Sequence, residues 1–425
     1  MSMEAGMRIA FHTLGCKLNQ AESELLARRF ADAGYQIVSG DGADIYVLNT
    51  CTVTHIADRK SRHLVRLWRK RNPQALIIVT GCYAQRAPQE LAQVGAGLVV
   101  GNGRKMHLLD LLKGEIAPVT HCSPEQLMAD GISRVRSCIK IQDGCNDSCA
   151  YCIVPKVRGR EHCLPMADVV KEVKVRVAAG CKEVVLTGTK IGDYKHNGAN
   201  LRQLVEQVLL VTSVERLHVS SLQPRDILPE LLDMWRDHRL CRHFHLALQS
   251  GSDAVLGRMR RHYSVEDYKQ AVSLIRKSVP DVAITTDIMV GFPGESVEEF
   301  EESYRFCEEI DFANIHVFSY SSRPGTLASG MPDQVNDRLK KERSLQVLDL
   351  AQRSLHKFCQ RFLGQRITVL WENEVTPGSG IYSGLSHNYI RIFTQSSEPL
   401  TNQFRLVRPV RLHKQGLWGE FTDED

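Results

Sequence analysis

Residues 138–152 are CIKIQDGCNDSCAYC, a short apolar run followed by three closely spaced cysteines. The run CIKIQ (138–142) is typical of a β-strand. Cys145, Cys149 and Cys152, here called the core cysteines, follow it with C-x3-C-x2-C spacing. Three thiolates this close together can face one small object, and they are one ligand short of the four that hold a cubane [4Fe-4S] cluster. The spacing therefore predicts such a cluster with one open iron.

Two other interpretations of the core cysteines stay open. Three unrelated buried thiols would need no common ligand. A zinc site usually recruits four cysteine or histidine ligands at looser spacing. Both fit the compact motif less well than an iron–sulfur cluster does.

Further apolar runs follow the cysteine loop and alternate with helical patterns such as ADVVKEVKVRVAAG and ESVEEFEESYRFCEEI. With CIKIQ they give six predicted strands, at 138–142, 183–187, 216–221, 244–248, 283–290 and 313–319. Strands that alternate with helices pair in parallel, and six are too few to close the usual eight-stranded barrel. We expect a partial (βα)6 barrel over residues 131–361, open at one side. A long amphipathic helix from about Asp333 to Gly364 is predicted at its end.

The regions on either side of the predicted barrel have other patterns. Upstream, MRIAFHTLG, ADIYVLNT and ALIIVTG each precede a helical pattern, which predicts an N-terminal parallel α/β domain over residues 7–118. An irregular stretch with Pro118, Pro124 and Gly131 predicts a linker. Downstream, RITVLWENE, GIYSGLSHNYIRIF and FRLVRPVRL are short alternating strands broken by Gly and Pro, so residues 364–425 are expected to form a small β-barrel. The predicted fold class is α/β.

The composition agrees with a folded, multidomain protein. The chain has 425 residues, 43% hydrophobic and 24% charged, which excludes a disordered, collagenous or coiled-coil protein. No apolar run approaches the roughly 18 residues of a membrane-spanning helix. The start MSMEAGMRIAFHT also lacks a basic stretch followed by an apolar one, so we expect a cytoplasmic protein without a membrane partner. The formal net charge of +5 is too small to prove a polyanionic partner by itself.

Cys16, Cys51 and Cys82, here called the N-terminal cysteines, are 35 and 31 residues apart, each just after one apolar run of the first domain. Loops at the carboxyl ends of neighbouring parallel strands lie side by side, so these thiols are expected to converge. Taken singly, each would more often be a buried small hydrophobe. Their joint placement instead predicts a second cubane with three thiolate ligands and one open iron.

Thirteen cysteines are many for a reducing compartment, where disulfides rarely persist, so metal binding or catalysis is the expected use of some of them. The seven outside the two sets share no common spacing and are expected to be structural thiols. They are Cys122, Cys138, Cys163, Cys181, Cys241, Cys307 and Cys359.

The core cysteine motif, with Tyr151 before its last cysteine, resembles the cluster motif of the radical S-adenosylmethionine superfamily. GCKLNQAESE (15–24), NTCTV (49–53) and GCYAQ (81–85) further resemble the methylthiotransferases of that superfamily. The likeness covers essentially the whole chain, through LTGTKIGDY (186–194), SSLQP (220–224), HLALQSGSDAVLGRMRR (245–261), TTDIMVGFPGE (285–295) and HVFSYSSRPGT (316–326). The C-terminal module is similar to the RNA-binding TRAM β-barrel.

The resemblance implies that a sulfur atom and a methyl group are inserted at an unactivated C–H bond, with S-adenosylmethionine as methyl donor and as radical source. The core cysteines would hold a [4Fe-4S] cluster whose electron cleaves S-adenosylmethionine to a 5'-deoxyadenosyl radical. The N-terminal cysteines would hold an auxiliary [4Fe-4S] cluster that carries the sulfur. An electron donor of the flavodoxin or ferredoxin kind and a sulfur source are the expected partners.

The resemblance also implies cofactor-binding residues at the carboxyl ends of the predicted strands, namely Tyr151, Thr187, Gly188, Thr189, Gln249 and Gly291. Backbone carbonyls at 187–189 would bind the amino group of S-adenosylmethionine, and Tyr151 would pack on its adenine. As simple turn or strand-end residues, they would need no such function. Asp287 lies inside an apolar run and would either line the cavity or be a hydrogen-bonded core aspartate.

A basic stretch without acidic residues, 59–71, lies downstream of Cys51. On a helix, one face would present Arg59, Arg62, Arg66 and Arg69 or Lys70, which suits an RNA backbone. An ordinary solvated helix face is the alternative. In the terminal module, Tyr382, Tyr389 and Phe393 would either stack on bases or, as is more usual in small barrels, belong to the core.

The word Cys16-Lys17-Leu18-Asn19 bears on the substrate. It resembles the branch that acts on N6-threonylcarbamoyladenosine in tRNA, at position 37 next to the anticodon, whose expected product is the 2-methylthio derivative. The isopentenyladenosine tRNA branch typically has Cys-Gln-Met-Asn there, and the ribosomal-protein branch has Cys-Pro-Lys-Asn. Both substrates remain alternatives. A non-catalytic two-cluster protein that binds RNA or carries electrons is an alternative of another class.

Overall fold

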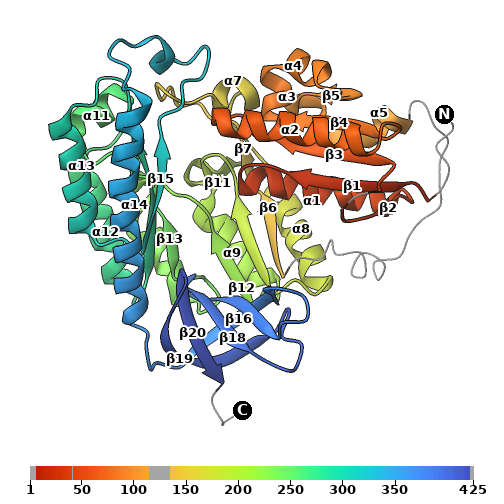
Figure 1. The fold of residues 1–425 in the computed structure, drawn as a ribbon. Helices are drawn as coiled ribbons and strands as arrows, with labels where there is room; N and C mark the ends of the chain where they lie inside the picture. Colours follow the sequence, from red (N-terminus) through yellow and green to blue (C-terminus); the bar gives the residue numbers. More distant parts are fainter. Residues whose placement is uncertain (1–5, 41, 114–134, 422–425) are drawn as a thin grey trace.

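The computed structural model describes residues 6–40, 42–113 and 135–421 (Figure 1). The predicted linker residues Pro118, Pro124 and Gly131 and the thiol Cys122 lie outside the described residues. Among the described residues, no helix is long and apolar enough to cross a membrane.

The N-terminal region is a five-stranded parallel sheet, as the α/β pattern predicts, with strand order β2-β1-β3-β4-β5. Its strands are β1 (Arg8–Thr13), β2 (Gln36–Ile37), β3 (Ile45–Thr50), β4 (Leu76–Gly81) and β5 (Leu98–Val100). The helices are α1 (Lys17–Asp32), α2 (His55–Arg71), α3 (Cys82–Arg86), α4 (Pro88–Gln93), η1 (Asn102–His107) and α5 (Leu108–Lys113). The short strands β2 and β5 extend the three that the sequence predicts.

Both faces of this sheet are buried because side chains alternate along each strand. In β3, Tyr46 and Leu48 pack with Trp68 of α2, whereas Ile45 and Val47 pack with Phe30 of α1 on the opposite face. Helix α1 therefore covers one face of the sheet, and it also contacts β6 of the central region (Figure 1).

The central region is an open, six-stranded parallel sheet, which confirms the predicted partial barrel. Strands β6 (Arg136–Lys140), β9 (Glu183–Thr187) and β12 (Arg216–Val219) form one half, and β13 (His243–His245), β14 (Ala283–Val290) and β15 (Asn314–Ser319) the other. Parallel bridges between Leu217 and Leu240 and between Leu222 and Leu246 join the halves. The first predicted strand (138–142) differs slightly, since β6 ends at Lys140 and Gln142 pairs in a separate small hairpin.

Helices alternate with these strands and cover the outside of the sheet. They are α7 (Val154–Arg158), α8 (Met166–Ala178), α9 (Leu201–Val211), α10 (Pro229–Leu232), α11 (Asp253–Arg258), α12 (Val265–Ser278), α13 (Val297–Ile310) and α14 (Asp337–Gln360). Two small antiparallel pairs are β7 (Gln142–Asp143) with β8 (His162–Cys163) and β10 (Lys195–His196) with β11 (Ala199–Asn200). The short turns are η2 (Ile191–Asp193), η3 (Pro224–Asp226), η4 (Asp233–Arg236) and η5 (Leu327–Gly330). Capping boxes begin α12 at Ser264 and α13 at Ser296.

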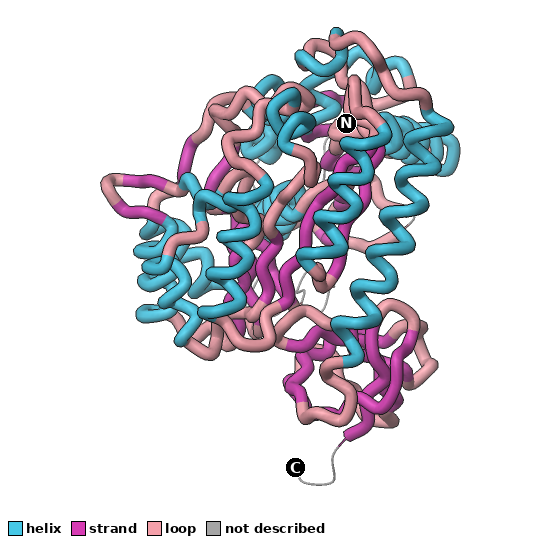
Figure 2. The backbone as a smooth tube through the Cα atoms, turned by 90° about the vertical axis from the view of Figure 1, so that its left-hand side faces the viewer, coloured by secondary structure: helices cyan, strands magenta, loops and turns pink. Residues whose placement is uncertain are grey.

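The C-terminal region is a closed five-stranded barrel in the order β16-β17-β18-β20-β19, as predicted. The strands are β16 (Ile367–Glu374), β17 (Ile381–Ser386), β18 (Arg391–Gln395), β19 (Phe404–His413) and β20 (Gly416–Phe421). Trp371 fills its core together with Phe358 and Phe362 from the end of α14. Figure 2 shows α14 running from the partial barrel to this module.

Candidate active site

The structure brings the N-terminal cysteines together at the carboxyl edge of their sheet. Cys16 is the N-cap of α1, Cys51 directly follows β3, and Cys82 begins α3. Burial, reinforced by the neighbouring Cys16 and Cys82 thiols, raises the pKa of Cys51 to about 12. The loop before α1 passes so close that a Cβ on Gly15 would lie 2.5 Å from the Cβ of Cys51.

This close approach gives a stability prediction with a matched control. Gly15 and Gly40 both have positive φ, +100° and +93°, but only Gly15 has neighbours in the way of a Cβ. Because crowding adds to the shared cost of a left-handed alanine, Gly15→Ala is expected to lower the free energy of unfolding by about 1–3 kcal/mol more than Gly40→Ala. Denaturant unfolding of both variants measures this difference. Equal losses would contradict the tight packing of Gly15 on Cys51.

The core cysteines lie in the loop between β7 and α7. The Sγ atom of Cys145 accepts a hydrogen bond from the Asp147 amide at 3.4 Å, and that of Cys149 accepts one from Nη1 of Arg261 at 3.4 Å. Burial, together with the charges of Cys149 and Cys145, raises the pKa of Cys152 to about 12. Arg261 ends the segment HLALQSGSDAVLGRMRR (245–261), and nothing in its local sequence pairs it with Cys149.

The chemistry of the two thiol sets fits iron–sulfur clusters. All described cysteines are free thiols, and neither set has a disulfide. Raised pKa values mean that burial favours the neutral thiol, so a cationic metal centre is what would stabilise the thiolate form. Their assignment as cluster ligands stays a prediction.

The two cysteine loops pack against one another. Cys82 lies in a small apolar cluster with Ile153 and Val157, which follow directly after Cys152. Asn102 donates a hydrogen bond from Nδ2 to the Val157 carbonyl at 2.7 Å, and the same nitrogen lies 3.6 Å from Sγ of Cys82. The contact holds the N-terminal set next to the core set.

A buried ionic network fixes α1 on the central region. Glu22, 4% exposed, pairs with Lys105 at 2.5 Å, with Arg158 at 3.1 Å and with Lys140 at 3.2 Å. Burial opposes ionisation of Glu22, but these three cations prevail and hold its pKa well below the usual range. Arg158 ends α7 and also contacts Asn19. The partners come from distant parts of the sequence, so the pattern around Glu22 did not predict them.

A second network lies where the loop after β15 meets the N-terminal sheet. Arg323 is only 1% exposed, and its Nη1 lies 2.6 Å from Oδ2 of Asp58. Arg86 binds the same carboxylate oxygen at 3.0 Å. The N-terminal region is thus held to the core by buried ion pairs at two separate places.

A cleft of about 670 Å³ runs along the inside of the partial barrel. Cys16, Thr187 at the end of β9 and the following Gly188 line it, and so does Tyr389 of the C-terminal barrel. Three basic side chains line the cleft, Lys17, Arg136 and Arg391, and its described lining contains no acidic residue. The cleft therefore suits a polar ligand with negative charge.

A line of hydrogen-bonded side chains runs along one wall of the cleft, and His243, Thr285, His245 and His316 of this line face the cleft. It runs from His218 to His243 (2.9 Å), Thr285 (3.1 Å), His245 (3.0 Å), Asp287 (3.2 Å) and His316 (3.3 Å). Both oxygens of Asp287 are hydrogen-bonded, which supports the interpretation as a satisfied, partly buried aspartate. Burial opposes its ionisation, yet the two imidazoles hold its pKa well below the usual range.

Ligand atoms of His245, Asp287 and His316 lie within 4.8 Å of one another, so these three side chains could also hold a metal ion. Tyr389 packs at the other end of the wall, with its ring centroid 4.4 Å from that of His218 and 4.6 Å from that of His243. Tyr389 is thus used in contacts with the core, not in an exposed stacking surface.

Some of the predicted cofactor residues line the cleft and others lie outside its described lining. Thr187 and Gly188 line the cleft, and the Thr189 amide donates to Oε1 of Gln142 at 2.8 Å while its hydroxyl is buried without a partner among the described residues. The described lining of the cleft includes neither Gln249 nor Gly291.

Gln249 has a φ of +70°, and its amide donates to the Asp287 carbonyl at 2.8 Å. The Gly291 amide donates to Oε2 of Glu295 at 2.7 Å, and Lys340 occupies the space where a Cβ would be. Tyr151 is partly buried and packs in an apolar cluster with residues such as Phe292. All three therefore have structural contacts of their own.

The predicted basic face of α2 is divided by the structure. Arg69 donates to the carbonyls of Gly95 and Pro73, at 2.9 Å and 2.7 Å, and Arg62 donates to Oη of Tyr83 at 2.5 Å. These two arginines stabilise the domain itself. The exposed members of the set, with no ion pair to any described residue, are Arg59, Arg66 and Lys70.

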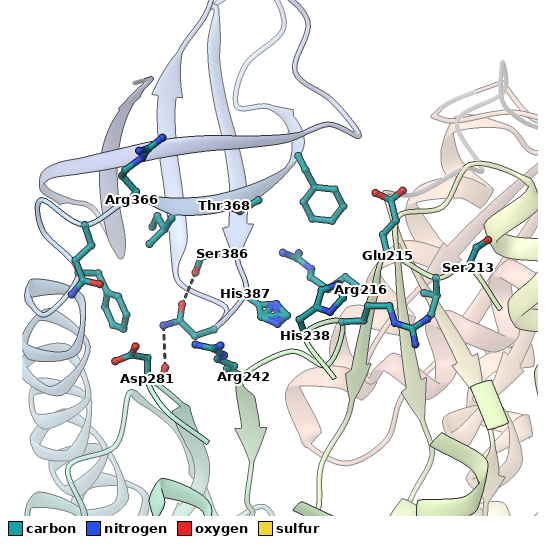
Figure 3. Close-up of a pocket in the computed structure, with 17 residues that line it drawn as sticks. Ser213, Glu215, Arg216, His238, Arg242, Asp281, Arg366, Thr368, Ser386 and His387 are labelled. Atoms are coloured by element: carbon teal, nitrogen blue, oxygen red, sulfur yellow. Dashed lines mark hydrogen bonds between the residues drawn. The ribbon is translucent and has the colours of Figure 1, made fainter. Parts of the chain in front are cut away.

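A second cavity, of about 710 Å³, lies between the amino-terminal ends of β12 and β13 and the C-terminal barrel (Figure 3). Arg216 and Arg242 line it from the core, and His387 lines it from the barrel. Asn388 crosses this contact by donating to the Asp281 carbonyl at 3.3 Å. None of the six predicted cluster ligands lines this cavity, so it belongs to the contact between modules.

Comparison with known proteins bears on the whole chain. Residues 139–307 match the model of the Radical SAM superfamily, and residues 8–101 match that of Uncharacterized protein family UPF0004. The chain is 38% identical to the threonylcarbamoyladenosine tRNA methylthiotransferase MtaB of Aquifex aeolicus (strain VF5), over 91% of this chain and 96% of the relative. It is 35% identical to the protein of that name in Bacillus subtilis (strain 168), over 97% and 96%.

A further relative is the tRNA-2-methylthio-N(6)-dimethylallyladenosine synthase of Thermodesulfovibrio yellowstonii, with 30% identity over 98% of this chain and 99% of the relative. Among solved structures, the radical S-adenosylmethionine methyltransferase TsrM of Kitasatospora setae, with cobalamin and a [4Fe-4S] cluster bound, is similar in fold, with a TM-score of 0.54. That match has 13% identity and covers 90% of this chain and 81% of the TsrM chain.

Proposed function

The chain belongs to the radical S-adenosylmethionine methylthiotransferase family and is therefore a transferase, and we propose that it adds a methylthio group to a modified adenosine of tRNA. The site proposed for attack is C2 of N6-threonylcarbamoyladenosine at position 37. Of the three relatives above, the two with the higher identity carry this base in their names, and the word Cys16-Lys17-Leu18-Asn19 also supports it.

The observation that carries the proposal is the packing of the N-terminal cysteine set against the loop of the core set, with Cys16 of the former lining the cleft. An electron carrier normally completes four protein ligands per cubane, whereas each set here offers three. Under the proposal, the core cysteines hold the cluster that supplies the electron for cleavage of S-adenosylmethionine, and the N-terminal cysteines hold the cluster that carries sulfur. Cys16 lines the cleft, so a substrate in the cleft would lie beside the sulfur-bearing set.

The remaining residues have proposed roles around these sets. Thr187, Gly188 and Thr189 would bind S-adenosylmethionine, and Thr189 offers a buried hydroxyl without a described partner for it. Gln249, Gly291 and Tyr151 would support that pocket from the neighbouring loops. The exposed part of α2 (Arg59, Arg66 and Lys70) would contact the RNA backbone.

We extend the proposal to the division of labour along the chain. Residues 7–118 would carry the auxiliary cluster, residues 131–361 would form the radical core, and residues 364–425 would form a TRAM-like RNA-binding module. An electron donor of the flavodoxin or ferredoxin kind and a sulfur source would complete the reaction.

The test uses anaerobically prepared protein with S-adenosylmethionine, a reductant and tRNA that carries threonylcarbamoyladenosine. Nucleosides from the digested tRNA are analysed by mass spectrometry, and the 2-methylthio derivative is the expected product. The relative that acts on dimethylallyladenosine makes tRNA with isopentenyladenosine the second substrate to assay, and ribosomes the third. A product on either of these and none on the first would overturn the proposed base, and absence of 5'-deoxyadenosine would overturn catalysis.

A further inference from the structure

Lys17 is a cation without a partner inside the cleft. It is the first residue of α1, directly after Cys16, and it lines the cleft. Its side-chain nitrogen forms no hydrogen bond or ion pair with any residue that the structure describes. The other two basic residues of the lining already have an ion-pair partner, because Arg136 and Arg391 share the carboxylate of Glu372.

The acids behind the cleft wall already have partners of their own. Glu183 is fully buried and pairs with Arg216 at 2.5 Å, and Asp287 is bound by His245 and His316. The charge of Lys17 instead acts on His218 and His243, whose pKa values fall well below normal through burial first and this cation second. A ligand with a negative group would therefore meet one free cation in the cleft and no competing acid.

The chemistry of the proposed substrate supplies such a group. A threonylcarbamoyl substituent carries the carboxylate of threonine, whereas a dimethylallyl substituent is an uncharged hydrocarbon. In adenine, N6 and C2 lie on the same edge of the ring, on either side of N1. A cation that holds the N6 substituent next to Cys16 would therefore also keep the C2 edge close to the N-terminal cysteines.

We propose that Lys17 is a specificity-determining residue that pairs with a carboxylate on the N6 substituent of the substrate adenosine. This inference rests on the proposed function, since it identifies what that site recognises. The same cation could instead bind a phosphate of the RNA backbone. The two sources differ in one respect, because only the carboxylate disappears when the adenosine is unmodified.

The experiment compares Lys17→Gln with wild type in equilibrium binding to tRNA that carries threonylcarbamoyladenosine and to the same tRNA with unmodified adenosine. Loss of a charged hydrogen bond is expected to weaken binding of the modified tRNA about 10- to 100-fold and to leave the unmodified tRNA unchanged. Lys17→Arg keeps the charge and should recover most of the affinity. Lys174→Gln, an exposed lysine of α8, is the matched control and should change neither value.

Iron content and release of 5'-deoxyadenosine are measured on the same preparations. Unchanged binding of both tRNAs would overturn the inference, and equal weakening of both would assign Lys17 to the phosphate backbone instead. If Lys17→Gln loses iron, the test rests on Lys17→Arg. A carboxylate site requires the Lys17→Arg variant to retain the preference for modified tRNA, and loss of that preference would overturn the inference. Failure of the wild type to modify threonylcarbamoyladenosine would overturn the proposed function and is seen independently of any variant.

Discussion

Cys149→Ala protein prepared without oxygen is expected to hold about four irons per chain, against about eight in the wild type, and to release no 5'-deoxyadenosine. The reason is that removal of one of three thiolates leaves the core set unable to retain a cubane. The N-terminal set, contributed by α1, β3 and α3, keeps all its ligands. Iron and sulfide analysis, with chromatography of the nucleoside products, measures both effects.

Cys51→Ala is the reciprocal variant. It should also retain about four irons, yet still cleave S-adenosylmethionine without transferring sulfur. Cys163→Ala is the matched control, since Cys163 is a half-buried thiol of β8 whose sulfur accepts only a hydrogen bond from the Lys195 amide at 3.4 Å. It should keep all irons. Loss of both clusters from either ligand variant would contradict two separate sites.

The places of the cysteines could be predicted because strand ends are visible in sequence. Apolar runs locate β1, β3 and β4, and in a parallel sheet their carboxyl ends must be neighbours. The same logic gave the six central strands. Apolar periodicity does not predict contacts between domains, such as that of Cys82 with Val157. Such a contact depends on the shapes of the two folded surfaces that pack together.

The polar side chains along the cleft wall have a spacing that is visible in the sequence. His243 and His245 are two residues apart in β13, and Thr285 and Asp287 are two apart in β14. Since side chains alternate along a strand, the two residues of each pair point to the same side of their strand. Because β13 and β14 are neighbours with His245 opposite Thr285, both pairs lie on the same face of the sheet. Polar residues at this spacing inside apolar runs therefore indicate a cavity wall, whereas from the sequence such a place is predicted for Asp287 alone.

The charge pattern of α2 was a weaker guide than the strands. A helix face of five cations suggests one surface, but Arg62 and Arg69 find partners in Tyr83 and in carbonyls such as that of Gly95. Those partners come from α3 and from the segment after α4, so local sequence does not separate a structural arginine from an available one. Only packing divides the five.

Glu22→Gln is expected to lower the free energy of unfolding by about 3–5 kcal/mol, because it leaves Lys105 buried without a counter-charge and leaves Arg158 and Lys140 to share Asp143. Lys105 is 1% exposed and its side-chain nitrogen lies 2.5 Å from the carboxylate, so neither water nor another described acid replaces the lost partner. Glu215→Gln is the control, since its pair with Lys182 at 2.7 Å is exposed. An exposed pair contributes at most about 1 kcal/mol.

The same substitution has a pH signature that a packing defect would lack. The pKa of Glu22 is lower in the folded protein than its ordinary value of about 4.3, so its charge stabilises the fold above that value. The contribution is full above about pH 5 and is lost progressively as pH falls toward the folded pKa. The stability difference between wild type and Glu22→Gln should therefore shrink from pH 6 to pH 3, whereas a difference that stays constant would mean that shape, and not charge, holds α1 on the core.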